Sequence, residues 1–426
     1  MQSLQPFAGI KVVEFGQFVA VPYCGQLLAD GGADVIKIES PEGDSSRHAA
    51  PLVPGITRVF LGRNRGKRSL PLKLRDPGAR PVIDALLEWA DVVLMNFRPG
   101  LATSLGLDGP ELRKRYPRLV IGAVTAFGTR GPDAELAGMD VVVQARSGLM
   151  AALGRVVDGQ PASGEPVPAD YMCAMTLAFG VASALYRRSW TGQGAGIDVS
   201  LMRAALTLAN NQMVRVEDHD GELHRAALRT LNEQRQARTP FQTQLETVNK
   251  ARHRPLLSVY FRTFVTADGN IAVACGSRAL RRRFADLLGF SDAGLDAGEP
   301  GGEEWSEHYE ALRVQVEAIV ATRPSAHWVG LLAEHGIPVA AVKMPIELFD
   351  DEQALANDMI VEQEHPEVGT VKLLGPPLAM DGDAFQTAPP MARLGSETRD
   401  LLNELGFGDA TIDAWVETGI TREQNR

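Results

Sequence analysis

Residues 10–40 read IKVVEFGQFVAVPYCGQLLADGGADVIKIES. The two ends of this stretch, 10–16 and 33–40, are short runs rich in β-branched residues, and residues 24–30 between them have the apolar spacing of a helix. A strand, a helix and a second strand in this order form a βαβ unit, in which the two strands run parallel. The stretch therefore predicts a parallel sheet.

The same alternation continues through the first two hundred residues. Helical patterns at 82–90 and 111–117 are interleaved with short apolar runs at 91–97 and 118–127. Strands that are covered by helices on both faces of a sheet are apolar almost throughout, because neither face meets water. We predict an α/β fold with a doubly wound, Rossmann-like parallel sheet.

The sequence changes character at about residue 214. Residues 214–256 are polar and rich in Gln and Arg, which is typical of a solvated helix and connector. Residues 257–344 begin with two alternating runs around Ala-Asp-Gly-Asn, a good hairpin pattern, and continue with helical spacing. We predict a large domain that begins with 1–213, a connector over 214–256 and a smaller α+β domain over 257–344.

Composition and charge exclude several classes of protein. The chain has 426 residues, of which 45% are hydrophobic and 23% charged, as in a globular enzyme with more than one domain. We find no apolar run of the length of a membrane span and no secretory signal. Three scattered cysteines, Cys24, Cys173 and Cys275, fit a reducing compartment, so we expect a cytoplasmic protein that does not bind membranes.

The net charge of −10 argues against non-specific binding of nucleic acid, which requires a basic surface. Basic residues do gather locally, in residues 64–68, with Arg75 and Arg98 further along the chain. A solvated loop is the favoured interpretation of such a run. A binding site for an anionic small molecule is the alternative.

Several common active-site motifs are absent from the sequence. There is no Walker loop, no G-x-S-x-G elbow and no HExxH motif, and the eight histidines are scattered, so we predict no metal site. The glycine-rich stretch TGQGAGIDVS, residues 191–200, follows a helical pattern and opens a strand. A dinucleotide-binding loop has the opposite order, so a glycine turn is the better interpretation.

Asp170 precedes a long apolar helical pattern in PVPADYMCAMTLAFGVASALYRR, residues 166–188. An Asp at the start of a helix is typically an N-cap, whose side chain accepts a hydrogen bond from a backbone N–H group. The same position suits an anionic nucleophile, because the helix dipole favours an ionised carboxylate at neutral pH. The local pattern leaves both roles open.

A set of segments along most of the chain resembles the class III CoA-transferase family, which includes formyl-CoA transferases, carnitine CoA-transferases and alpha-methylacyl-CoA racemases. The segments keep the family's order. They are residues 9–44, 64–79, 90–100, 118–132 and 138–148, the helix that opens at Asp170, TGQGAGIDVSL, and near the C-terminus 335–351, EHPEVGTVKLLGPP and RLGSETRDLLNELGF.

The resemblance implies a catalytic role for Asp170. In the family the acid at this position is the nucleophile that attacks an acyl-CoA thioester, giving first an anhydride and then an aspartyl-CoA thioester. The implied reaction moves CoA from an acyl-CoA to a free carboxylic acid. It needs no metal and no tightly bound cofactor, since coenzyme A is itself the substrate.

The resemblance also implies a CoA-binding surface. The positions that match the family's CoA-binding segments are Phe18, Val19, Ala20, Leu72, Arg75, Asn96, Phe97 and Arg98. Gln17, Met139 and Asp140 are expected to line the substrate pocket. Ser40 and Ser104 stand where many relatives have arginine, so phosphate contacts must be partly redistributed.

Met139 separates the possible reactions of this fold. Racemase members have a histidine at this position as one of two bases, and a thioether cannot move a proton at neutral pH. A core filler and a residue lining the acyl pocket are both open for Met139. Asp140 is expected to hold a backbone, to orient the pocket, to cap a helix or to be solvated. CoA transfer is favoured over an isomerase of the same fold, by intramolecular CoA shift or α-proton racemisation, and over a CoA-binding protein without turnover.

The family resemblance implies an assembly as well as a fold. In the family both chain ends form the large domain, so residues 345–426 are expected to return to it. Two ring-like chains interlock as a homodimer in the family, and we expect the same here.

Overall fold

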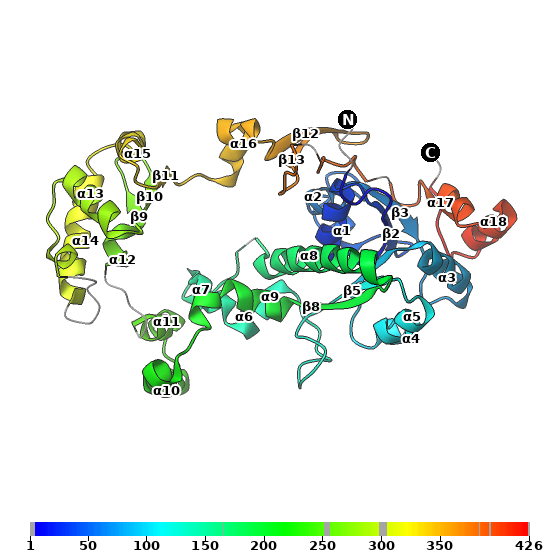
Figure 1. Ribbon diagram of the computed structural model, residues 1–426, viewed down its shortest axis with the longest axis horizontal. Coiled ribbons are helices and arrows are strands. Elements are labelled where there is room, and N and C mark those ends of the chain that lie inside the picture. Colours follow the sequence, from blue (N-terminus) through cyan, green and yellow to red (C-terminus); the bar gives the residue numbers. More distant parts are fainter. Residues whose placement is uncertain are drawn as a thin grey trace. The chain divides into compact units, whose positions relative to one another are not determined.

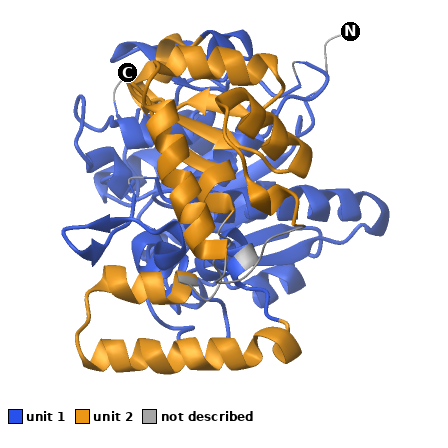
Figure 2. Ribbon diagram, turned by 90° about the vertical axis from the view of Figure 1, so that its left-hand side faces the viewer, with its two compact units in different colours: residues 1–215, 352–426 blue, residues 216–351 orange. Residues whose placement is uncertain are grey.

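The computed structural model describes residues 5–164, 166–250, 256–297, 305–382, 384–391 and 393–424. The chain divides into two compact units, the first formed by residues 1–215 and 352–426 and the second by residues 216–351 (Figure 2).

The first unit is built on a six-stranded sheet with the order β3-β2-β1-β4-β5-β8 (Figure 1). Every neighbouring pair in this sheet is parallel, which confirms the predicted α/β class and the βαβ unit at its start. The strands are β1 (Lys11–Phe15), β2 (Asp34–Glu39), β3 (Lys67–Pro71), β4 (Val92–Met95), β5 (Val120–Thr125) and β8 (Ala195–Ser200).

Helices cover both faces of this sheet, and alternate strand residues point to opposite sides. On β1, Val12 belongs to one hydrophobic core and Val13 to the other. The first core is closed by α1 (Ala20–Asp30), α6 (Asp140–Ser147), α7 (Leu149–Leu153), α8 (Pro168–Thr191) and α9 (Leu201–Leu208). The second is closed by α3 (Arg80–Trp89), α5 (Gly109–Arg115), α17 (Thr398–Glu404) and α18 (Asp409–Glu417).

Residues from near both ends of the chain meet in the second core. Leu401 and Ile412 pack there with Leu70 of β3, and Leu72 is bridged to Thr421. The other elements of the first unit are η1 (Ser45–His48), α2 (Arg58–Asn64), η2 (Pro77–Ala79), α4 (Leu101–Ser104), β6 (Val156–Val157), β7 (Gln160–Pro161), η3 (Asn210–Gln212), α16 (Glu352–Ala356) and the antiparallel pair β12 (Ile360–His365) and β13 (Gly369–Leu374).

The basic run at residues 64–68 is not the solvated loop expected from its composition. Arg65 and Lys67 are buried, and Lys67 and Arg68 begin β3. Arg65 forms two hydrogen bonds to the carboxylate of Asp30, and Arg68 pairs with Asp34. Since these guanidinium groups are neutralised inside the fold, the run is not a free binding site for anions either.

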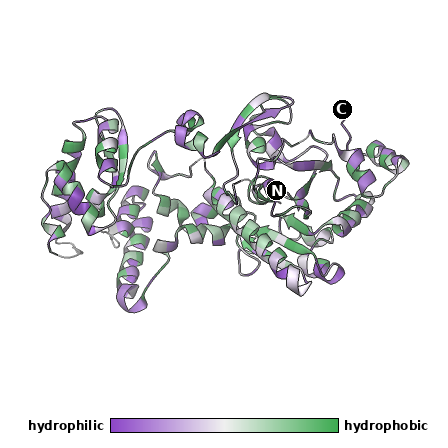
Figure 3. Ribbon diagram, turned by 45° about the horizontal axis from the view of Figure 1, so that its top comes forward, coloured by the Kyte–Doolittle hydropathy of each residue, from purple (hydrophilic) through white to green (hydrophobic). Residues whose placement is uncertain are grey.

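One helix in the described part of the chain, α8, has the length and composition of a membrane span, contrary to the expectation that none would. It packs against α1, α9, β5 and β8 within the first unit, and hydrophobic residues occur along most of its length but not in its last turn (Figure 3). The face of α8 that covers the sheet is apolar because it forms part of the core, so the composition of the helix is weak evidence for a membrane.

The second unit contains the hairpin expected around residues 267–270. Strands β9 (Phe261–Val265) and β10 (Asn270–Ala274) pair antiparallel, and β11 (Val339–Ala341) adds to β10. Their core includes Phe264, Phe284 and Trp328. The helices are α10 (Glu217–Gln236), α11 (Phe241–Lys250), α12 (Leu257–Tyr260), α13 (Arg278–Leu288), η4 (Ala293–Leu295), α14 (Ser306–Val320), α15 (Ser325–Glu334) and η6 (Pro345–Asp350).

Candidate active site

The order in which strands are added to the sheet reverses between β1 and β4, since the chain crosses from β3 on one side of β1 to β4 on the other. In open parallel sheets, ligands bind beyond the carboxyl ends of the strands at such a point. The two loops that leave these strands are joined by one side chain. Asn96 accepts a hydrogen bond from the backbone N–H of Gln17 at 3.1 Å and donates to the carbonyl of Gln17 at 2.9 Å.

The loop after β1 has an unusual backbone at Phe18. Its φ of 68° lies in the left-handed region, which a non-glycine residue adopts at a cost of roughly 1–3 kcal/mol. Phe18 is 41% exposed, whereas Val19 and Ala20 are buried at the start of α1. Such strain persists only where the surroundings fix it, and it concentrates at ligand sites.

Buried charged side chains of the sheet hold the loop after β1 in place. Lys37 of β2 donates to Glu14 of β1 at 2.8 Å and to the carbonyl of Gly16 at 2.6 Å. Lys67 of β3 pairs with the same Glu14 at 2.9 Å and donates to the carbonyl of Pro22 at 2.7 Å. The two lysines therefore hold the chain at both ends of the loop, while Glu14, which pairs with both, and Asp44, which pairs with Lys37, compensate their charge.

Asp170 does not cap α8, contrary to one expectation from the sequence. The helix begins at Pro168, its N-cap residue is Val167, and Asp170 is the third residue of the helix. Its backbone N–H, which has no acceptor within the helix, donates to Oδ2 of Asp140 at 3.0 Å. Asp140 thus performs the capping, and no hydrogen bond or ion pair engages the Asp170 carboxylate within the described part of the chain.

Asp140 is buried at the start of α6, which makes the solvated alternative wrong. Its second carboxylate oxygen, Oδ1, accepts a hydrogen bond from the side-chain amide of Gln144, one turn further along the helix. Met139 precedes it as the N-cap residue and is 55% exposed, so Met139 is not a core filler. Asp140 therefore holds a backbone, one of the roles that the sequence left open.

The electrostatic surroundings of Asp170 differ from those expected for a helix start. Burial, and next the negative charge of Asp140, raise the pKa of Asp170 to about 7, while Arg63 opposes the shift. The helix dipole was expected to keep the carboxylate fully ionised at neutral pH. With a pKa of about 7 the carboxylate is only partly ionised at neutral pH, because burial and the charge of Asp140 disfavour the ionised form.

Arg63, near the end of α2, is a neighbour that the sequence did not single out. Its Nε donates to the hydroxyl of Tyr171 at 3.2 Å, and its guanidinium lies 5.6 Å from the centre of the Tyr171 ring. The Tyr171 ring in turn meets Tyr23 of α1 edge-on at 4.9 Å. Residues 63 and 171 are far apart in the sequence, so no local pattern could have revealed the contact.

The other predicted CoA-binding residues have varied surroundings. The side chain of Leu72 is buried in the core, so only its backbone is available to a ligand. Phe97 packs against Phe15 with ring centres 5.8 Å apart. Arg75 and Arg98 are exposed.

Two serines were noted because many members of the resembled family have arginine there. The hydroxyl of Ser40 donates to the carbonyl of Gly43 at 3.0 Å, and that of Ser104 donates to the carbonyl of Leu101 at 2.8 Å. Both hydroxyls therefore serve the local backbone.

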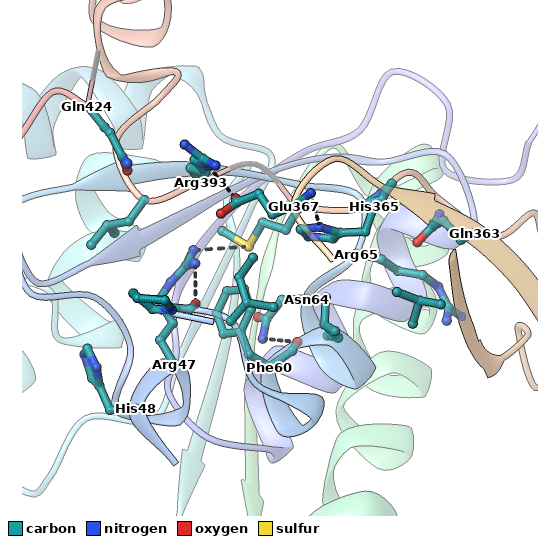
Figure 4. A pocket seen from close by; sticks show the side chains of 18 of the residues that line it. Arg47, His48, Phe60, Asn64, Arg65, Gln363, His365, Glu367, Arg393 and Gln424 are labelled. Carbon is teal, nitrogen blue, oxygen red and sulfur yellow. Dashed lines mark hydrogen bonds and ion pairs between the residues drawn. The ribbon is translucent and has the colours of Figure 1, made fainter. Parts of the chain in front are cut away.

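A separate cavity of about 270 Å³ lies between α2 and the β12–β13 pair (Figure 4). Two of the arginines that line it are paired with carboxylates: Arg47 with Glu39, and Arg393 with Glu367. Asp170 is not among the residues that line it. The described residues contain no group of three or more His, Cys, Asp or Glu side chains arranged to hold a metal ion.

The fold defines a class of protein, a doubly wound α/β protein whose strand order reverses between β1 and β4. Residues 7–398 match the model of CoA-transferase family III. The chain belongs to CoA-transferase family III and is an enzyme of that family.

Relatives of known name agree with this family. The acetyl-CoA:oxalate CoA-transferase of Acetobacter aceti is 30% identical over 95% of this chain and 97% of its own. The succinate–glutarate CoA-transferase of Agrobacterium fabrum is 29% identical over 94% of this chain and 96% of its own.

Solved structures agree with the fold. A crystal structure of an aspartate-to-alanine variant of the Mycobacterium tuberculosis protein Rv3272 has a TM-score of 0.74 and 27% identity, covering 93% of this chain and 98% of that one. A CaiB/BaiF family protein from Brucella suis has a TM-score of 0.71 and 27% identity, covering 95% of this chain and 100% of that one.

Proposed function

We propose that the protein transfers CoA from an acyl-CoA thioester to a free carboxylic acid, with Asp170 as the nucleophile. The observation that carries this proposal is the pairing of Asp140 with the backbone of Asp170. It fixes the start of α8 while leaving the Asp170 carboxylate without a partner. A carboxylate with a raised pKa is also a stronger nucleophile than an ordinary one.

The reaction proceeds in two symmetrical halves. A carboxylate oxygen of Asp170 attacks the donor thioester, the C–S bond breaks, and a mixed anhydride and the CoA thiolate form. The thiolate attacks the Asp170 carbonyl and releases the donor acid, which leaves an aspartyl-CoA thioester. The acceptor carboxylate attacks that thioester, and the thiolate released then attacks the acceptor carbonyl, giving the new acyl-CoA and free Asp170. No proton is consumed overall.

The loops at the edge of the sheet suit the CoA arm in this proposal. Gln17 and Asn96 would line the site next to Phe18, and Val19 and Ala20 would offer backbone N–H groups where α1 begins. Exposed cations at Arg75 and Arg98 would meet the phosphates, for which guanidinium groups are well suited. Leu72 would contribute through its backbone and Phe97 through the loop after β4.

The related reactions have less support. Racemisation requires a second base, and Met139 has no proton to exchange. An intramolecular CoA shift needs only Asp170 but has no specific observation in its favour. The interlocked homodimer, the domain roles and a cytoplasmic location remain part of the proposal.

The test is trapping of the covalent intermediate. After incubation with a panel of acyl-CoA donors, hydroxylamine treatment and peptide mass spectrometry should locate an adduct on Asp170. Asp170→Ala should abolish both the adduct and turnover. Asp218→Ala, which removes an exposed Asp from the first turn of α10, is the matched control and should retain both. Full turnover by Asp170→Ala would refute the mechanism.

A further inference from the structure

Tyr171, the residue that follows the proposed nucleophile Asp170, holds the side chain of Arg63 in place. Tyr171 accepts the hydrogen bond from Nε at 3.2 Å and lies under the guanidinium at 5.6 Å, which fixes the direction of the side chain. Because Tyr171 follows Asp170 directly, this contact ties the end of α2 to the start of α8. The positive charge is close enough to lower the pKa of Asp170 against the effect of burial.

The guanidinium of Arg63 has no carboxylate partner within the described part of the chain. Its two terminal nitrogens donate no hydrogen bond there, although the residue is partly buried. Two other arginines nearby in the sequence differ: Arg47 forms two hydrogen bonds to Glu39, and Arg65 forms two to Asp30. The charge of Arg63 acts on the Asp170 carboxylate without a direct contact, and that carboxylate loses its charge when it is acylated. A partly desolvated cation is then costly unless a ligand supplies the counter-charge.

A guanidinium whose terminal nitrogens are free presents the fork that binds a carboxylate through two hydrogen bonds. The phosphates of CoA are separated from its thiol by the whole pantetheine arm. A substrate anion that meets this cation next to the nucleophile therefore belongs to the acyl group.

We propose that Arg63 binds a second carboxylate at the far end of the acyl group, so that the enzyme acts on dicarboxylic acids and their CoA thioesters. The inference rests on the proposed function, since one carboxyl carbon must react at Asp170 while the other carboxylate pairs with Arg63. Tyr171 is the positioning residue for this guanidinium.

The test compares matched donors in the first half-reaction alone, so that no acceptor is needed. Glutaryl-CoA is compared with valeryl-CoA, and succinyl-CoA with butyryl-CoA, by the single-turnover rate of adduct formation on Asp170. The unmodified enzyme should favour the diacid thioester of each pair. Arg63→Met should lower that preference by about 10- to 100-fold, the worth of a charge-assisted hydrogen-bonded pair.

The ratio of the two rates within a pair separates recognition of the second carboxylate from a general effect on the reactivity of Asp170, because both donors react with the same nucleophile. Arg63→Lys, which keeps the charge but loses the fork, should retain part of the preference. Arg58→Met, on the exposed first turn of the same helix, is the matched control and should retain all of it. Tyr171→Phe should lower the preference without removing it, and it keeps the test decisive if Arg63→Met does not fold.

Equal rates of adduct formation on Asp170 of the unmodified enzyme with both members of each pair would overturn this inference while leaving the proposed function intact. An unchanged ratio in folded Arg63→Met would overturn it in the same way. The absence of an adduct with every donor would instead refute the proposed function.

Discussion

At the scale of single residues, the site is set by two carboxylates with unequal surroundings. Asp140 is buried and satisfied by the Gln144 amide and the Asp170 backbone, whereas the Asp170 carboxylate has no such partners among the described residues. Two nearby carboxylates disfavour simultaneous ionisation, so the less stabilised one takes up a proton more easily. Burial is the larger cause of the raised pKa of Asp170, and the charge of Asp140 adds to it.

The rate of Asp170 acylation should therefore depend on pH. The nucleophile is the ionised carboxylate, so the rate should be low at pH 5, rise through an apparent pKa of about 7 and level off above it. Asp140→Asn should move the rise in rate to lower pH, because it removes the negative charge that raises the pKa of Asp170. The amide oxygen of the asparagine can still accept the hydrogen bond from the Asp170 N–H, so the helix start should be kept. Single-turnover rates measured from pH 5 to 9 check this; a flat profile, or a rise at higher pH in Asp140→Asn, contradicts it.

Much of this site could not be predicted from the sequence. The resemblance pointed to Asp170 and Asp140, but the local pattern offered Asp170 itself as the helix cap and left its role open. The acceptor that replaces it lies thirty residues earlier, and the contact between Arg63 and Tyr171 spans an even longer separation. Such contacts depend on tertiary packing, which periodicity and capping patterns do not describe.

At the scale of elements, the first three neighbouring strands β3, β2 and β1 are joined by buried charges as well as by their backbone ladder. Glu14 lies between Lys37 and Lys67, and each lysine also binds a loop carbonyl. The sequence did not predict β3 because Lys67 and Arg68 are typical of a solvated loop. They fit a strand of the sheet only because Lys67 pairs with Glu14 and Arg68 pairs with Asp34. The apolar strands β1, β2, β4 and β5 were predicted because hydrophobic pattern alone defines them.

The packing of α1 against these charges leaves no room for a side chain at Gly25. A Cβ there would lie 2.0 Å from Oε2 of Glu14, which the two lysines hold in place. Gly25→Ala should lower the free energy of unfolding by about 1–3 kcal/mol, as for other overpacked sites.

Gly62→Ala is the matched control for this substitution, since nothing lies within 4 Å of its Cβ position on α2. It should raise the free energy of unfolding by up to about 1 kcal/mol, because alanine is the better helix former. Urea unfolding followed by circular dichroism measures both, and equal effects of the two substitutions would refute this account of Gly25.

At the scale of the whole molecule, the outer face of α8 requires an explanation that its core face does not. Phe179, Tyr186 and Trp190 are 74%, 71% and 62% exposed, and the last two rings contact each other at 4.6 Å. Their spacing puts them on one side of the helix. Exposed aromatic residues gathered in this way mark an interaction surface, and the proposed homodimer supplies a second copy to cover it.

The proposed dimer makes this face sensitive to charge. The double substitution Phe179→Asp and Trp190→Asp should weaken self-association by about 30-fold or more, since buried aromatic anchors are worth about 2 kcal/mol or more at interfaces. Val314→Asp, at an exposed apolar residue of α14, is the control and should leave association unchanged. Sedimentation velocity over a dilution series checks both. A folded monomer of the unmodified chain at every concentration would contradict the homodimer, and an unaffected dimer in the double variant would show that this face lies outside the interface.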